Sequence, residues 1–169
     1  MKRNLRLGLI LPLALALSGC GLEPMYAGGE HGAVAQALSE VEVGPIEGQQ
    51  GWLVRNALVD RIGAAGKGQG RYRLDVVLDD QITGFGIRSN NTVTRERRTL
   101  RARFKLIDMS NQAVLLDATA GSDAGIDVVT SEYAVIAAEQ TALEHLSGEV
   151  ADQIVTRVAI YVRQHRAKE

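Results

Sequence analysis

The spacing of apolar residues changes several times along this chain, and each change predicts a different element. Residues 39–46 alternate between apolar and acidic side chains, which is typical of a strand, and Pro45 marks its end. Residues 51–65 then change to a helical period, with one apolar face formed by Leu53, Ala57, Leu58, Ile62 and Ala65. The glycine-rich run 66–70 is expected to end this helix.

Three consecutive segments then return to a period of two, which indicates strands. They are residues 71–82, 93–107 and 113–120. The inward side chains expected in the middle segment are Leu100, Ala102, Phe104 and Leu106. The connection 83–92 is rich in glycine and asparagine, so we expect a hairpin with an extended tip. Three amphipathic strands in a row predict an antiparallel meander with one apolar face.

The last part of the chain predicts one long amphipathic helix from Ser131 to about His165. Thr130 or Ser131 can cap its start, and Gly148 is a candidate for a bend. Apolar residues recur there at intervals of three and four at Ile136, Leu143, Val150, Ile154, Val158 and Tyr161.

Each predicted helix has one apolar stripe and the meander has one apolar face. The simplest way to bury these surfaces packs both helices on the same side of the sheet. We therefore expect an α+β fold with two layers, in which a four-stranded, mostly antiparallel sheet carries two helices on one face. The first strand can pair in parallel after its helical crossover, but the sequence does not fix the strand order beyond the meander.

The N-terminus has the pattern of an exported bacterial lipoprotein. A basic start with Lys2, Arg3 and Arg6 precedes the apolar residues 7–17, which are too few to span a bilayer. The following Leu17-Ser18-Gly19-Cys20 resembles a lipobox, in which the cysteine sulfur receives a diacylglyceryl group and the cysteine then becomes the first mature residue. We expect a signal peptide over 1–19, a lipidated N-terminus and tether over 20–38, and a folded domain over 39–169. The alternative is an ordinary signal peptide with an incidental cysteine.

Composition narrows the possible functions. Loss of residues 1–19 removes three basic and no acidic side chains, so the net charge changes from −1 to −4. This acidity argues against nucleic-acid binding. The single cysteine excludes a disulfide framework, a cysteine-based zinc site and a second thiol as a nucleophile. The three histidines are scattered and the glycine-rich stretches match no nucleotide-binding motif. We expect no enzyme activity, no cofactor and no metal.

The most distinctive chemical feature is a row of basic side chains on the outward face of the middle strand. The row consists of Arg95, Arg97, Arg101, Arg103 and Lys105. Alternate strand residues are about 7 Å apart, so it extends over about 30 Å. Asp75 and Asp79 of the neighbouring strand, together with Glu96 or helix carboxylates, can neutralise part of this charge. Alternatively, the row can bind an anionic ligand or an acidic partner surface. Both interpretations stay open.

The expected hairpin tip is a second candidate, because it carries the apolar residues Phe85 and Ile87 between glycines and asparagines. Such side chains either fold back onto the core or are presented to another protein. The sequence does not distinguish these two possibilities.

The mature chain resembles the LptE family of lipopolysaccharide-assembly lipoproteins. The similarity rests on the order of Cys20-Gly21-Leu22-Glu23-Pro24-Met25-Tyr26, one helix after the first strand, the meander with its basic strand, and Ser131-Glu132-Tyr133-Ala134. Leu22 and Met25 depart from the phenylalanine and leucine that are usual in the family. The resemblance covers nearly the whole mature chain.

The resemblance implies a lipoprotein at the periplasmic face of a Gram-negative outer membrane, anchored through Cys20. It would plug the lumen of the β-barrel LptD, assist its assembly and deliver lipopolysaccharide to the outer leaflet. On this view the basic row meets lipopolysaccharide phosphates or acidic groups of the lumen, and Phe85 and Ile87 contact the barrel. These site assignments come from charge and apolar patterning, not from a family motif.

Two other classes stay open. One is an accessory lipoprotein of a phospholipid or ABC transport system, which predicts an inner-membrane transporter as partner. The other is an anchored hydrolase, which the sequence disfavours because no catalytic set is found.

Overall fold

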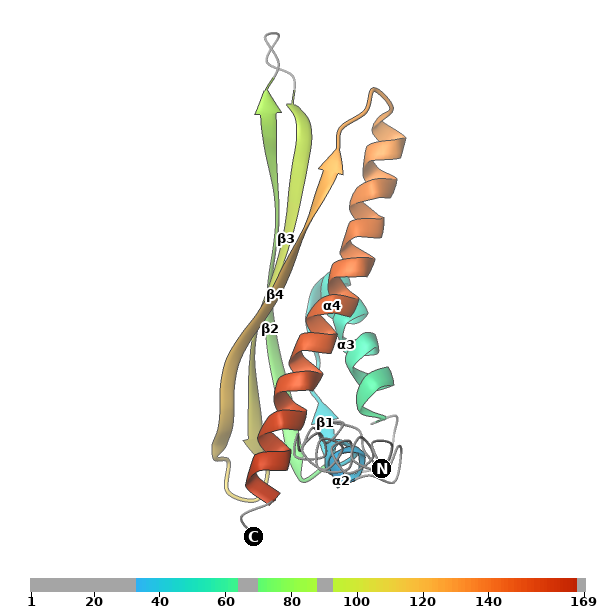
Figure 1. Cartoon of the computed structure of the whole chain (residues 1–169). Helices are drawn as coiled ribbons and strands as arrows, with labels where there is room; N and C mark the ends of the chain where they lie inside the picture. The colour runs from blue at the N-terminus through green and yellow to red at the C-terminus, as the bar shows by residue number, and fades with distance from the viewer. Residues whose placement is uncertain (1–32, 64–69, 88–92, 167–169) are drawn as a thin grey trace, which may run out of the picture.

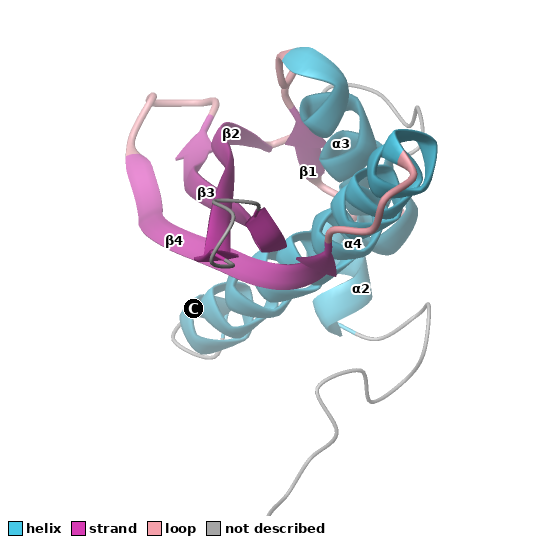
Figure 2. Cartoon of the chain, turned by 90° about the horizontal axis from the view of Figure 1, so that it is seen from above, coloured by secondary structure: helices cyan, strands magenta, loops and turns pink. Residues whose placement is uncertain are grey.

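The protein folds into an open four-stranded sheet with helices on one face, as shown in Figures 1 and 2. This computed structural model describes residues 33–63, 70–87 and 93–166 of the 169-residue chain. Along the chain the elements are α2 (Ala33–Leu38), β1 (Val41–Val43), α3 (Gly48–Ile62), β2 (Tyr72–Ile87), β3 (Val93–Asp108), β4 (Val114–Asp127) and α4 (Glu132–Arg166). The predicted α+β fold with two layers is confirmed.

The strand order is β1-β2-β3-β4. β1 pairs in parallel with the start of β2, from Val41 opposite Tyr72 to Val43 opposite Leu74, and α3 supplies the crossover between them. β2, β3 and β4 form the predicted antiparallel meander. The parallel first pair, which the sequence permitted without requiring it, makes the sheet mixed.

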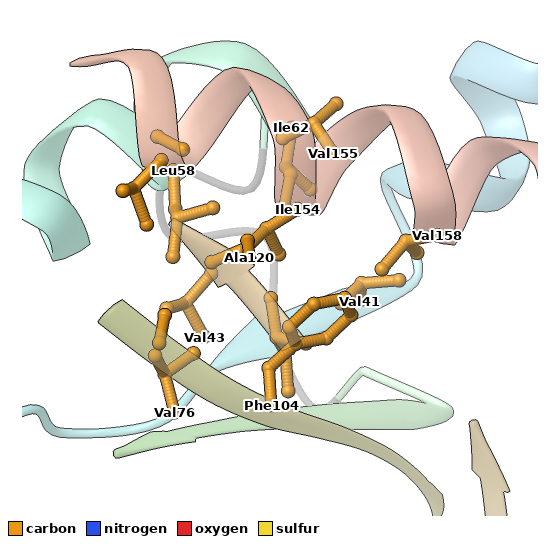
Figure 3. Close-up of a cluster of buried hydrophobic side chains, with 14 of the residues drawn as sticks. Val41, Val43, Leu58, Ile62, Val76, Phe104, Ala120, Ile154, Val155 and Val158 are labelled. Carbon is orange, nitrogen blue, oxygen red and sulfur yellow. The ribbon is translucent and has the colours of Figure 1, made fainter. Parts of the chain in front are cut away.

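The hydrophobic core lies between the sheet and the two long helices (Figure 3). All four side chains expected to point inward from the middle strand are buried, and Phe104 is the largest fully buried side chain. α3 contributes Val54, Leu58 and Ile62 to the same core. The period-two pattern therefore identified the inner face of β3. The helical pattern identified the inner face of α3 only in part, because Leu58 and Ile62 are buried as predicted, while Leu53 is only partly buried and the unpredicted Val54 is fully buried.

The ends of the helices follow ordinary capping chemistry. The backbone N–H of Ala134 donates to Ser131 Oγ at 3.4 Å, so Ser131 is the N-terminal cap of α4. This helix continues without a break through Gly148. α3 ends earlier than the glycine run 66–70, because Gly63 takes the left-handed conformation (φ 67°) and donates its N–H to the Val59 carbonyl.

β2 and β4 are longer than their sequence patterns predicted, whereas β3 matches its prediction to within one residue. β2 continues to Ile87 and β3 begins at Val93, so residues 83–87 belong to a strand and not to a hairpin tip. Gly86 has a positive φ of 77° and has no partner on β3, which is typical of a local irregularity in a strand pair. The pairing continues on both sides of it, with Phe85 opposite Arg95 and Ile87 opposite Val93. β4 continues to Asp127 instead of ending at residue 120, because its second half pairs with β3 throughout.

Two further expectations are corrected. Ile136 was expected on the buried face of the last helix, but its side chain is 62% exposed because the first turns of α4 extend past the core. The folded part also begins before residue 39, since α2 starts at Ala33 and both Val34 and Leu38 join the core cluster. Cys20 and most of the expected tether lie outside the described residues.

None of the helices in the described part of the chain combines the length and the apolar character needed to cross a membrane.

Candidate functional site

The basic row lies on the outer face of the sheet, opposite the helices. The described elements leave this face open, because α2, α3 and α4 all pack on the other side (Figure 2). The side chains of β3 alternate between buried and exposed over residues 100–104, which directs Arg101 and Arg103 outward. The predicted direction of the row is therefore confirmed.

Most of the row is paired with carboxylates of β4. The Arg95 Nε lies 3.0 Å from Asp127 Oδ1. Arg103 makes a two-pronged contact with Asp117, with Nε to Oδ1 at 3.0 Å and Nη2 to Oδ2 at 2.9 Å. The Nζ of Lys105 is 4.0 Å from the same carboxylate. Asp117 thus serves two cations, which leaves a local positive excess at this end of the row.

The expected neighbours on β2 are not the partners of the row. Asp75 lies opposite Lys105 in register, but its carboxylate accepts both hydrogen bonds of Arg73, at 2.8 and 3.1 Å. Asp79 lies opposite Arg101, but its carboxylate accepts hydrogen bonds from the Gln81 side-chain amide at 3.1 Å. Cross-strand neutralisation does occur, but the strand that provides it is β4.

Arg97 contacts an aromatic ring. Its guanidinium carbon lies 5.4 Å from the centre of the Phe85 ring, which is within the range of a cation–π contact. No carboxylate lies within ion-pair distance of Arg97 among the described residues. Phe85 lies on the outer face of β2 and is 39% exposed, so its side chain is neither buried in the core nor part of a protruding loop. Ile87 is the last residue of β2, where it pairs with Val93 of β3.

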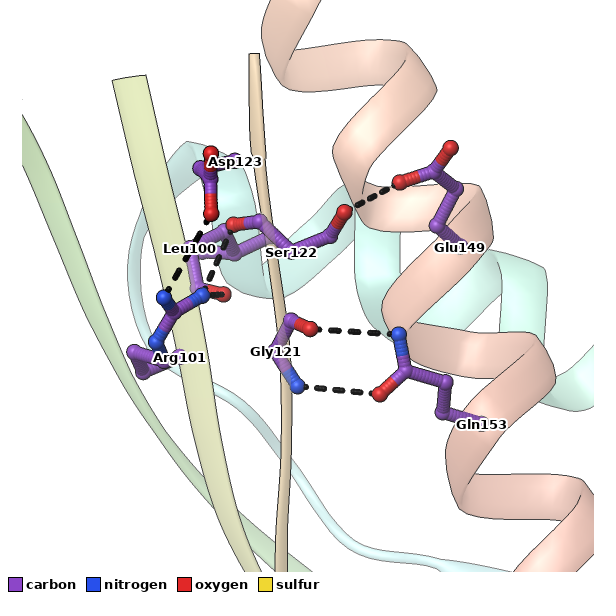
Figure 4. A network of polar contacts seen from close by, with 7 residues as sticks. All are labelled: Leu100, Arg101, Gly121, Ser122, Asp123, Glu149 and Gln153. Carbon is purple, nitrogen blue, oxygen red and sulfur yellow. Dashed lines mark hydrogen bonds and ion pairs between the residues drawn. The ribbon is translucent and has the colours of Figure 1, made fainter. Parts of the chain in front are cut away.

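The Arg101 side chain contacts Ser122 and Asp123 of β4, as Figure 4 shows. Its Nη1 donates to the Ser122 carbonyl at 3.0 Å, and its Nη2 is 3.6 Å from Asp123 Oδ1. Gly121 makes this position possible, because a Cβ there would lie 2.4 Å from the Arg101 Cδ. On the helix side, the Gln153 side chain bonds both the N–H and the carbonyl of Gly121 at 3.1 Å.

A cavity of about 580 Å³ opens beside these residues. Three guanidinium groups contribute to its lining, from Arg101, Arg103 and Arg157, and the last also donates to the Thr119 carbonyl. The lining includes Val77, which is 72% exposed. Three cations next to an exposed apolar side chain can accommodate a molecule that has both phosphate groups and hydrocarbon.

The ion pairs perturb the titration of the groups involved. Hydrogen bonds from Arg103 lower the pKa of Asp117 below its ordinary value, and Lys105 adds to this effect through its charge. The same hydrogen bonds raise the pKa of Arg103. Both groups therefore stay charged at neutral pH, so the pairing persists there unless an anion displaces the Asp117 carboxylate.

A polar cluster on the inner face of the sheet was not predicted from the sequence. Arg98 donates to both oxygens of Asp80, at 2.9 and 2.6 Å, and to the Glu139 carbonyl of α4 at 2.9 Å. Burial, followed by the charge of Glu139, raises the pKa of the neighbouring Glu96. This cluster could have been predicted from the sequence, because Asp80 of β2 and Arg98 of β3 are charged residues at positions that point toward the core. In the register of the two strands they are diagonal neighbours.

No group of three or more histidine, cysteine or acidic side chains in the described ranges could hold a metal ion.

The sequence matches a protein-family model described as "LptE: Lipopolysaccharide-assembly" over residues 38–158. No curated protein matches the chain closely enough to count as a relative.

Several solved structures share the fold. A protein described as a lipoprotein from Caulobacter crescentus CB15 is 25% identical, with a TM-score of 0.65, and the match covers 77% of this chain and 96% of that one. The rare lipoprotein B of Shewanella oneidensis is 10% identical, with a TM-score of 0.57 and coverage of 76% and 97%. A minor lipoprotein of Acinetobacter baumannii is 14% identical, with a TM-score of 0.55 and coverage of 71% and 91%.

Proposed function

Because the chain belongs to the LptE family of lipopolysaccharide-assembly proteins, we propose that it is a non-enzymatic outer-membrane lipoprotein that plugs an LptD-type β-barrel. In this role it helps to assemble the barrel and to insert lipopolysaccharide into the outer leaflet. The observation that carries the proposal is the family match, which extends through the whole sheet and most of α4.

The outer face of the sheet supports a place inside a barrel. The lumen of a large membrane barrel is polar, so a plug needs a charged surface there and not an apolar one. On this face the arginines of β3 lie beside the aspartates of β4. Arg95 pairs with Asp127 at one end, and Arg103 pairs with Asp117 farther along. β2 and β3 have 16 residues each, which is about 50 Å of strand and long enough to extend deep into a barrel.

The cavity on this face supports direct contact with lipopolysaccharide. Guanidinium groups bind phosphates through two parallel hydrogen bonds, and Arg101 and Arg103 present theirs beside the exposed Val77. The ligand is expected to compete with Asp117 and Asp123 for these arginines. The phosphates of lipid A or of the core sugars would supply the competing charge.

The remaining assignments concern anchoring and the barrel contact. Acyl chains on Cys20 would hold the protein at the periplasmic face of the outer membrane, since two or more chains make a durable anchor. Phe85 and Ile87 lie at the far end of β2, where they would contact the barrel wall.

Charge reversal of two arginines tests the ligand surface. The double variant Arg101→Glu/Arg103→Glu is expected to bind purified lipopolysaccharide about tenfold or more weakly, because two phosphate contacts become repulsive. Binding is measured by titration of the purified lipoprotein, and the unfolding midpoint is expected to stay nearly unchanged because both side chains are exposed.

The matched control changes the net charge equally on other surfaces. Arg55 of α3 and Arg163 of α4 are exposed and do not line the cavity. The variant Arg55→Glu/Arg163→Glu is therefore expected to bind lipopolysaccharide like the parent protein. Equal losses in the two double variants would mean that only net charge matters, and no loss in either would remove this face as the binding surface.

A further inference from the structure

One edge of the sheet is left largely unpaired. β1 pairs with only the first three residues of β2, from Tyr72 to Leu74, while β2 continues to Ile87 (Figure 1). The chain leaves this edge at Gly44 and Pro45, because a proline has no N–H for the ladder. No other described strand lies beside the rest of β2 on this side.

The backbone groups of this edge point outward at alternate residues. The Tyr72 N–H donates to the Glu40 carbonyl at 3.1 Å, and the Leu74 carbonyl accepts from the Gly44 N–H at 3.0 Å. The alternation of a strand directs the N–H and C=O groups of the next even-numbered residues to the same side. They are Val76, Leu78, Asp80 and Ile82. Within the described chain, no hydrogen bond satisfies these groups on that side.

A groove marks the place where a further strand would begin. It has a volume of about 530 Å³ and lies between β2 and the segment that leads into α3. Ile46, Val76 and Leu78 give it apolar walls, and Glu47 adds a carboxylate. The groove thus continues the line of β1 along β2, with room for apolar side chains on its inner side.

The charges along this edge of β2 favour an added strand that carries basic side chains. Between residues 75 and 82 there are three aspartates and no basic side chain. Arg73 and Arg98 occupy both oxygens of Asp75 and of Asp80, respectively. Asp79 bonds only the neutral Gln81 amide and lies on the outer face, where an added strand would place its own side chains. A basic side chain beside Asp79 would complete the pairing.

We propose that the β2 edge from Val76 to Ile82 binds an extended segment of a partner protein by strand addition, and that this segment alternates basic with apolar residues. Unpaired edges are the usual templates for such addition. A second copy of this chain fits poorly, because two antiparallel β2 edges would bring their aspartates together. The edge recognises the segment through its backbone and through this alternation of side chains.

Amide exchange of the full mature lipoprotein, followed by NMR in a non-ionic detergent, tests this proposal. In the free protein the amides of Val76, Leu78, Asp80 and Ile82 are expected to exchange quickly. The probe is a blocked peptide of alternating lysine and valine. At saturation it is expected to slow these four amides by about tenfold or more, since each gains a hydrogen bond.

Paired variants at one position separate backbone pairing from side-chain effects. Ile82→Pro and Ile82→Ala both remove the exposed isoleucine side chain, but only the proline removes the edge N–H. The proline variant is expected to bind the peptide about tenfold more weakly than the alanine variant. Because the Ile82 N–H points away from β3, the proline leaves the pairing with β3 in place.

Several outcomes would overturn the proposal. They include equal binding of a peptide methylated on alternate backbone nitrogens, equal binding of a glutamate–valine peptide, and peptide-induced changes confined to other surfaces. Edge amides that are already slow in the free protein would show that the edge is occupied, by a second copy if the protection depends on concentration and by the chain itself if it does not. None of these results bears on lipopolysaccharide binding, which is measured separately.

Discussion

Replacing Phe104 by alanine is expected to lower the free energy of unfolding by about 3–5 kcal/mol. Phe104 is fully buried between the sheet and α4, among side chains that include Val41 and Val158 (Figure 3). Two effects contribute to this cost. The variant loses the free energy gained when the ring is removed from water, and it leaves a cavity that the close-packed neighbours fill only in part. Domains of this size are stable by about 5–15 kcal/mol, so the variant loses a large share.

Urea unfolding followed by circular dichroism measures this loss. Phe85→Ala is the matched control, because it removes the same side chain from the same sheet on the outer face. Its expected cost is about 1 kcal/mol, from partial exposure and the lost contact with Arg97. Similar costs for the two variants would contradict the assignment of inner and outer faces.

Removing one partner of the inner ion pair is expected to be nearly as damaging. The side chains of Arg98 and Asp80 are only 12% and 13% exposed. Arg98→Met leaves the Asp80 carboxylate without its two hydrogen bonds and removes the positive charge that also faces Glu139. Loss of one partner of a buried pair costs about 3–5 kcal/mol, because the other charge remains without compensation.

Two comparisons test this explanation by urea unfolding. The double variant Arg98→Met/Asp80→Leu removes both charges and is expected to recover most of the lost stability. Arg103→Met breaks an exposed pair and is expected to cost less than about 1 kcal/mol. If the double variant were less stable than Arg98→Met, the stranded carboxylate would not be the cause.

Sequence periodicity predicted the fold well where one face of an element is uniformly apolar. The inward residues of β3 were all identified because Leu100, Ala102, Phe104 and Leu106 alternate with charged residues without exception. α4 was found for the same reason. Its exposed start at Ile136 was not foreseen, because a helical stripe does not tell where along its length the helix packs on the sheet.

The sequence pattern failed to predict strand segments that form because a neighbouring strand pairs with them, and not because their own residues favour a strand. The second half of β4 contains Gly121, Ser122, Asp123 and Gly125, which are poor strand residues, but the long β3 beside it pairs with all of them. Residues 83–87 of β2 were misassigned for the same reason. A short helix such as α2 has too few turns for its period to be recognised.

The same failure explains what was missed at the candidate site. The outward direction of the basic row was predicted correctly, but its partners were sought on β2. Two of the actual partners, Asp123 and Asp127, lay beyond the predicted end of the third strand at residue 120, although they fall on the same face as Asp117 because all three numbers are odd. Asp117 lay within the predicted strand 113–120 and was overlooked as a partner.

The central claim is that this lipoprotein works with an outer-membrane barrel in lipopolysaccharide assembly. Purification of the acylated protein from the envelope in mild detergent, with mass spectrometry of its partners, tests this claim most directly. We expect an LptD-type β-barrel in equal amount, together with bound lipopolysaccharide. Recovery of an inner-membrane transporter complex in place of the barrel would contradict the account.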